Sequence, residues 1–167
     1  MHLLQNNSNF VDNSKYKMSD IYSKQKRSEI MSHISGKETK PEIMVRKYLF
    51  SEGFRFRKNV KNLPGKPDIV LAKYKTVIFI HGCFWHGHSC KRGALPNTNA
   101  VFWETKIEGN VERDKRDIAE LEKQGWEVIV IWQCEIRTAQ LRERYLQTLI
   151  TKLQQPKSNR ILITFYN

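Results

Sequence analysis

The stretch from residue 82 to residue 101 places the strongest constraint on how this chain can fold. It mixes Gly, Cys, His, Pro and Asn without helical or strand periodicity, so it is predicted to be a loop. An irregular loop of this length inside a small domain needs an internal support. Cys83, His88 and Cys90 lie in this loop, and the remaining cysteine, Cys134, follows a later apolar run.

These four side chains are of the types that zinc prefers as ligands. A tetrahedral zinc on Cys83, His88, Cys90 and Cys134 would tie the loop to the edge of a sheet. Four protein ligands leave no position open for water, so this zinc would be structural. The alternative is that the cysteines are small buried hydrophobic side chains, which is the simpler explanation for Cys134 alone. The odd number of cysteines and the lack of a secretory pattern at the N-terminus argue against disulfides.

The rest of the chain alternates helical and strand-like segments, which predicts an α/β fold with a central mixed β-sheet flanked by helices. Thr39, Pro41 and Glu42 have the spacing of a capped helix start. Helices are expected over 23–34, 39–53, 103–123 and 141–153, and strands over 54–57, 68–72, 76–80, 126–132 and 161–165. Residues 1–18 are expected to form a flexible N-terminal tail, and residues 19–167 a single domain.

The balance of charge favours a polyanionic partner. The chain has 29 Lys and Arg against 17 Asp and Glu, a formal net charge of +12. Each basic side chain that neutralises a phosphate releases condensed counterions. A solvated basic surface without a nucleic-acid partner has the same composition, as in ribosomal or heparin-binding proteins. No apolar run approaches the roughly 20 residues of a membrane span. We therefore expect a cytoplasmic protein, associated with the nucleoid in a bacterium, and no membrane partner.

Hydrolytic chemistry is indicated by polar residues beside two predicted strands. Asp68 precedes an apolar strand, where its carboxylate can bind a hard divalent cation of the kind that assists phosphodiester cleavage. His81 and His86 follow the next strand, and either could act as a general base or hold a protonated charge against a phosphate. Asp114 could orient His86, and Glu42 could reach a cation through water. The alternatives are a Pro-Asp turn, a helix cap for Glu42 and a charged helix face for Asp114.

Three aromatic side chains, Phe84, Trp85 and Trp103, flank the same loop. Exposed aromatic rings beside a basic surface can stack on bases or wedge between them. Ordinary core packing is the alternative explanation. The loop therefore combines candidate metal ligands, candidate catalytic histidines and candidate DNA-contacting rings.

Seven short motifs occur in order along the chain: Arg27-Ser-Glu-Ile-Met31, Lys37-Glu-Thr-Lys-Pro41-Glu42, Gly53-Phe-Arg-Phe-Arg57, Leu63-Pro-Gly-Lys-Pro-Asp68, Phe79-Ile-His-Gly-Cys-Phe-Trp-His86, Asn110-Val-Glu-Arg-Asp114 and Gly125-Trp126. Together these motifs resemble those of the very-short-patch (Vsr) DNA mismatch repair endonucleases of bacteria, from about Ser19 to Arg137. Residues 1–18 and 138–167 lie outside the resemblance. The Pro-Asp dipeptide is similar to that of restriction nucleases, but the later Glu/Asp-x-Lys is missing.

The resemblance implies a nuclease that nicks duplex DNA 5′ of the thymine in a T·G mispair left by 5-methylcytosine deamination. It also implies a restriction-endonuclease-like core, a structural zinc and a catalytic magnesium. The partners implied are T·G-mispaired double-stranded DNA and repair-pathway proteins, with the protein acting as a monomer. Position by position, magnesium binding falls on Asp68, catalysis on His81, His86, Asp114 and Glu42, zinc on Cys83, His88, Cys90 and Cys134, and intercalation on Phe84, Trp85 and Trp103.

Two other functions remain open at this point. One is a nuclease of the same fold with another mismatch preference or a role in restriction. The other is a zinc-stabilised DNA-binding module without catalysis, although a pure DNA-binding module would not need Asp68, His81 and His86 together.

Overall fold

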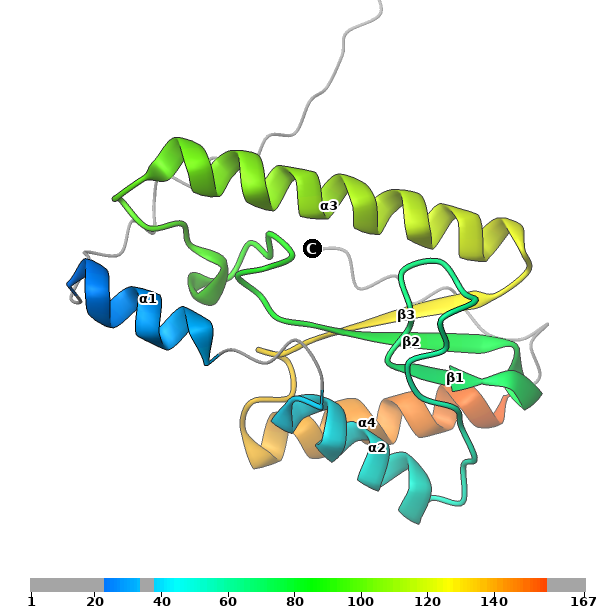
Figure 1. Ribbon diagram of the computed structural model, residues 1–167. Helices are drawn as coiled ribbons and strands as arrows, with labels where there is room; N and C mark the ends of the chain where they lie inside the picture. The colour runs from blue at the N-terminus through cyan, green and yellow to red at the C-terminus, as the bar shows by residue number, and fades with distance from the viewer. Residues whose placement is uncertain (1–22, 34–37, 156–167) are drawn as a thin grey trace, which may run out of the picture.

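The computed structural model describes residues 23–33 and 38–155 (Figure 1). Three strands form one mixed sheet in the order β1-β2-β3. The central strand β2 pairs antiparallel with β1 and parallel with β3. The elements in chain order are α1 (Lys24–Ser32), α2 (Lys40–Ser51), β1 (Ile69–Leu71), η2 (Ala72–Tyr74), β2 (Thr76–His81), η3 (Lys91–Gly93), α3 (Ala100–Lys123), β3 (Glu127–Trp132) and α4 (Ala139–Gln154).

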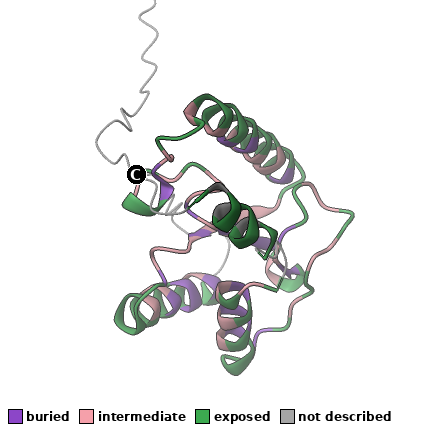
Figure 2. Ribbon diagram, turned by 60° about the vertical axis from the view of Figure 1, so that its left-hand side comes forward, coloured by how far each residue is buried: buried purple, intermediate pink, exposed green. Residues whose placement is uncertain are grey.

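The sheet is flanked by helices on both faces, which confirms the predicted α/β class with a mixed sheet. In Figure 1, α3 lies along one side of the sheet, and α2 and α4 lie together on the other. The larger core cluster joins α2 and α4 to one sheet face through residues such as Leu49, Ile78 and Leu146. The smaller cluster packs Leu121 of α3 against Val77. The strand residues Ile69, Leu71, Val77, Ile78 and Ile131 are fully buried, and Figure 2 shows buried residues on parts of the helices as well.

The pairing of the strands determines where the loop after β2 emerges. Residues Thr76 to His81 of β2 pair in register with residues Glu127 to Trp132 of β3. Since the two strands are parallel, their carboxyl ends meet at the same edge of the sheet. The crossover between them consists of the irregular loop and α3. The loop and Cys134, which follows β3, therefore start from neighbouring strand ends.

The start of α2 follows the predicted capping signature. The Thr39 side chain accepts a hydrogen bond from the backbone N–H of Glu42, and the Glu42 side chain accepts one from the backbone of Thr39. Pro41 lies in the first turn, where no helical N–H is lost. This reciprocal arrangement satisfies two backbone donors that would otherwise have no helical partner.

Several predicted boundaries differ from the structure. The strand expected over 54–57 is reduced to a single bridge between Arg57 and Val70, because Phe54 packs into the core at the end of α2. α3 begins at Ala100, three residues earlier than expected. The predicted tail (1–18) and the strand over 161–165 lie outside the described residues. Within the described part, no helix is both long and apolar enough to span a membrane.

Candidate active site and metal centre

A cleft of about 1010 Å³ opens where β2 ends, between the start of α2 and the middle of α3. Each of the five side chains predicted to take part in catalysis lines this cleft: Glu42, Asp68, His81, His86 and Asp114. They come from four separate parts of the chain. The fold therefore brings the candidate catalytic residues together, although most of them are far apart in the sequence.

Asp68 lies just before β1 and faces the neighbouring strand. Its Oδ2 accepts a hydrogen bond from the backbone N–H of Ile80 at 2.7 Å. Burial raises the pKa of Asp68 to about 6, the Ile80 N–H opposes that rise, and the nearby charge of Glu42 adds to it. Within the described residues, Oδ1 has no hydrogen-bond partner. A half-buried carboxylate with one free oxygen fits a divalent cation.

The two histidines stack on one another, with ring centroids 3.7 Å apart and planes 8° from parallel. His81 is only 6 % exposed, and burial lowers its pKa to about 3. It is therefore neutral at physiological pH and does not hold a positive charge against a phosphate. His86 is more exposed, and its Nδ1 lies 2.5 Å from Oδ2 of Asp114. A hydrogen bond from Nδ1–H to the carboxylate leaves the Nε2 lone pair free to accept a proton.

α3 holds the loop at two positions one helical turn apart. Asp114 binds His86, and Asn110, one turn earlier, donates from Nδ2 to the backbone carbonyl of Trp85 at 2.9 Å. Asn110 is itself buried, and its Oδ1 accepts a hydrogen bond from Arg113. No role for Asn110 was predicted from the sequence. The signal that could have revealed it is the i, i+4 spacing with Asp114, which places both side chains on one helix face.

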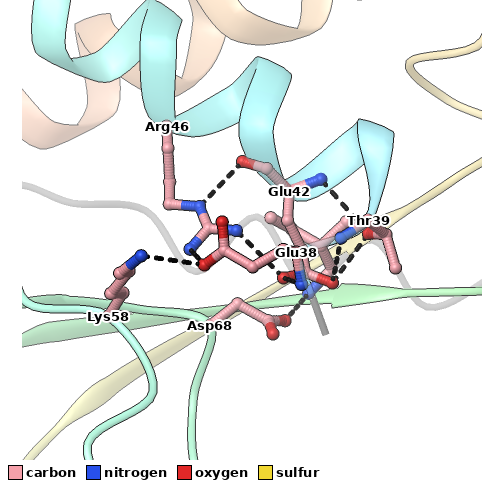
Figure 3. Close-up of polar contacts among 7 residues, drawn as sticks. Glu38, Thr39, Glu42, Arg46, Lys58 and Asp68 are labelled. Atoms are coloured by element: carbon pink, nitrogen blue, oxygen red, sulfur yellow. Dashed lines mark hydrogen bonds and ion pairs between the residues drawn. The ribbon is translucent and has the colours of Figure 1, made fainter. Parts of the chain in front are cut away.

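Glu42 has the helix-capping contacts that were considered as its alternative explanation, and it also lines the cleft. Arg46, one turn further along α2, forms a buried ion pair with Glu42, with 3.0 Å between Nη2 and Oε2 (Figure 3). Both side chains are less than a tenth exposed. Arg46 was not identified from the sequence, since an i, i+4 pair of opposite charges is common on solvated helix faces.

The four predicted zinc ligands form a second cluster. The ligand atoms of Cys83, His88, Cys90 and Cys134 all lie within 4.8 Å of one another. Nδ1 of His88 is 3.5 Å from Sγ of Cys134, and the His88 ring stacks on Trp132 with centroids 4.2 Å apart. The prediction that these four residues lie together is therefore confirmed.

The chemistry of this cluster fits a soft divalent cation. Burial, together with the neighbouring Cys83 thiol, raises the pKa of Cys134 to about 12, and burial also raises the pKa of Cys83. Crowded buried thiols ionise readily only when a cation compensates their charge. The loop turns tightly to reach this arrangement: a Cβ on Gly93 would lie 1.8 Å from the carbonyl oxygen of His88, so only glycine fits there.

The three predicted DNA-contacting aromatics pack on each other beside the cleft. The Phe84 ring lies 5.1 Å from both Trp85 and Trp103, in edge-to-face geometry. All three side chains are partly exposed. Phe102 extends the cluster, with its ring 5.1 Å from that of Trp103, and is 52 % exposed.

Comparison with known proteins identifies the family to which the chain belongs. Residues 19–92 match the family model of the DNA mismatch endonuclease Vsr. The DNA mismatch endonuclease Vsr of Escherichia coli K12 is 43 % identical over 120 residues, which cover 72 % of this chain and 77 % of the relative. The chain belongs to the Vsr family. The resemblance inferred from the seven motifs is therefore confirmed.

Two further relatives of this Vsr family protein are named type II nicking enzymes. V.NmeAIP of Neisseria meningitidis serogroup A is 53 % identical over 137 residues, covering 82 % of this chain and 98 % of the relative. V.XorIIP of Xanthomonas oryzae pv. oryzae is 44 % identical over 133 residues, covering 80 % and 98 %. The similarity extends over nearly the whole length of both relatives.

Proposed function

We propose that this protein is an endonuclease that nicks duplex DNA 5′ of the thymine in a T·G mispair by magnesium-dependent phosphodiester hydrolysis, and so initiates very short patch repair. Membership of the Vsr family supports the endonuclease class, since the E. coli relative is named a DNA mismatch endonuclease. The observation that carries the proposal is the cleft in which Asp68, His81, His86 and Asp114 meet.

Each residue of the cleft has a chemical role in this proposal. His86 takes the proton from the attacking water through Nε2, and Asp114 holds the imidazole in the required tautomer and orientation. Neutral His81 supports the phosphate or a water by hydrogen bonding. Asp68 holds magnesium, which when bound neutralises charge on the scissile phosphate and on the leaving oxygen.

The loop serves the same reaction through two further groups. Cys83, His88, Cys90 and Cys134 hold a structural zinc that keeps the loop against the end of β3. Phe84, Trp85 and Trp103 wedge into the duplex at the mispair, and the formal charge of +12 favours the DNA backbone. The core that supports these groups is of the restriction-endonuclease type.

In the cell, this enzyme acts as a monomer on T·G-mispaired double-stranded DNA, and the nicked DNA is then processed by proteins of the repair pathway. Its place of action is the bacterial cytoplasm, at the nucleoid.

A second candidate is a nuclease of the same fold that serves a restriction system or cuts at other mismatches. The names of the relatives from Neisseria and Xanthomonas, both type II nicking enzymes, favour this alternative. A DNA-binding module without catalysis is less consistent with the cleft, because pure binding requires neither the paired His86 and Asp114 nor the half-buried Asp68.

Cleavage of end-labelled duplexes carrying each possible mispair, with matched duplexes as controls, tests the proposal. Magnesium-dependent nicking 5′ of the thymine in T·G alone is the expected result. Cutting of matched DNA would favour the restriction alternative. We expect Asp68→Ala to abolish nicking while zinc content and duplex binding are retained; normal nicking by this variant would refute the mechanism.

A further inference from the structure

Arg46 makes an unusual set of contacts for a charged residue that is 7 % exposed. Its Nε donates to the backbone carbonyl of Glu42 at 3.2 Å, and its Nη2 donates to the carboxylate of the same residue at 3.0 Å. Its Nη1 donates to Oε1 of Glu38 at 3.1 Å. Three nitrogen atoms of one planar guanidinium are used, a geometry that lysine cannot reproduce. Arg46 therefore holds Glu42 and Glu38 in fixed positions (Figure 3).

The carboxylate of Glu42 is fully occupied by protein donors. Oε1 accepts hydrogen bonds from the backbone N–H and the hydroxyl of Thr39, at 3.3 and 2.7 Å. Oε2 accepts from the backbone N–H of Glu38 at 3.1 Å and from Arg46. An ionised carboxylate offers about four lone-pair positions. Each of them is used, so Glu42 has none left for a cation.

Glu42 nevertheless lies beside Asp68 in the wall of the cleft, and Figure 3 shows the two carboxylates as neighbours. Two carboxylates in such a position are natural joint ligands of one divalent cation. Lys58 adds a second cation to the network by donating to Oε1 of Glu38 at 2.9 Å. Two positive and two negative side chains therefore balance, and of the three carboxylates among these described residues only Asp68 forms no ion pair.

We propose that Arg46 is a positioning residue that keeps Glu42 from binding directly to the divalent cation held by Asp68. The inference rests on the proposed cation site at Asp68. Glu42 then influences the cation through space or through water. With one carboxylate instead of two, more of the coordination sphere stays open to water and to phosphate oxygens, as phosphodiester cleavage requires.

Direct binding of Mn²⁺, measured by isothermal titration calorimetry on the zinc-containing protein, tests this inference without relying on activity. Arg46→Met frees one lone-pair position of Glu42, so we expect Mn²⁺ to bind about tenfold more tightly, as one additional favourable contact would give. Nicking by this variant should be slower. Damage to the fold would weaken Mn²⁺ binding, so tighter binding cannot result from such damage.

The double variant Arg46→Met/Glu42→Gln covers the case in which the single variant does not fold, because it removes both buried charges together. We expect its Mn²⁺ affinity to stay within about twofold of the wild-type value, since Glu42 is not a ligand in the native site. An affinity about tenfold weaker would show that Glu42 binds the cation directly and would overturn the inference. An Arg46→Met variant that folds and binds no more tightly would overturn it as well.

Lys152→Met is the matched control. Lys152 pairs with Glu127 at 3.0 Å, and both side chains are nearly buried at the opposite end of the sheet. Losing this pair should leave Mn²⁺ affinity unchanged; an equal tightening would show that the effect is not specific to Arg46 and would refute the inference. A wild-type protein that bound no Mn²⁺ would refute the proposed cation site itself, which is a separate result.

Discussion

Replacing Asp68 by asparagine should stabilise the protein while abolishing its activity. Burial raises the pKa of Asp68 from its ordinary value of 3.8 to about 6. Because the pKa is higher in the folded state, the ionised carboxylate destabilises the fold increasingly as the pH rises through this range. A shift of about 2 units corresponds to about 3 kcal/mol at pH 8. An asparagine carries no charge, and its Oδ1 can still accept the N–H of Ile80.

The size of the effect should depend on pH in a defined way. Linkage gives a gain of about 3 kcal/mol at pH 8 and about half of that at pH 5, where much of the wild-type carboxyl group is protonated. For a chain of this size, a gain of 3 kcal/mol raises Tm by about 6 to 12 °C. This is an upper limit, because the amide of asparagine also loses hydration on burial. The assay is thermal unfolding of both proteins at the two pH values in buffer without magnesium.

Two outcomes would refute the reasoning. One is an Asp68→Asn variant no more stable than the wild type at pH 8. The other is a gain of the same size at pH 5 and pH 8, because that gain could not come from ionisation. Added magnesium provides a control: it should raise the Tm of the wild type by mass action and leave the variant unchanged. An equal response of both proteins would place the cation elsewhere.

Three other predictions concern the remaining parts of the site. Elemental analysis should find one zinc per chain, and Cys134→Ser should lose that zinc together with part of its thermal stability; native protein without zinc would contradict the assignment. His86→Ala should lower kcat by about 10² to 10⁴-fold, and Asp114→Asn should lower kcat by at least about tenfold with KM for the duplex unchanged. A fall in duplex affinity as large as the fall in kcat would show that these residues bind DNA instead. Trp85→Ala should weaken binding to mispaired duplex by about 1 to 3 kcal/mol and binding to matched duplex by much less; equal losses would exclude a wedge at the mispair.

The elements with strong local signals could be predicted from the sequence. The capping pattern at Thr39 and Glu42 and the apolar runs of β2 and β3 gave the correct helices and strands, because propensity and burial agree there. The cluster of candidate metal ligands was predictable for a different reason. Its ligand types are rare enough in a polar loop that Cys83, His88 and Cys90 pointed to one shared partner.

What could not be predicted depends on contacts between distant segments. The alternation of residues 54–57 resembles a strand, but only Arg57 pairs, and Phe54 is used for core packing. The stacking of His81 on His86, and the burial that keeps His81 neutral, require the loop to fold back on β2. The sequence pattern around Arg46 is typical of an exposed helix residue. In the structure Arg46 is buried and forms ion pairs with Glu38 and Glu42.

One face of α3 aligns most of the groups that the proposed reaction uses. Along this helix, Trp103 packs on Phe84, Asn110 binds the backbone of Trp85, and Asp114 binds His86. Asp117, nearly one turn further, lies against Gly65 in the turn that leads to Asp68: a Cβ at Gly65 would be 3.2 Å from Cβ of Asp117.

Successive turns of this face therefore contact the aromatic cluster, the loop, the candidate base and the turn before the candidate cation ligand. Helical spacing of three to four residues keeps these contacts in line. A rigid helix can thus set the distance between the proposed wedge in the mispair and the phosphate to be cut, while the proposed zinc holds one end of the loop.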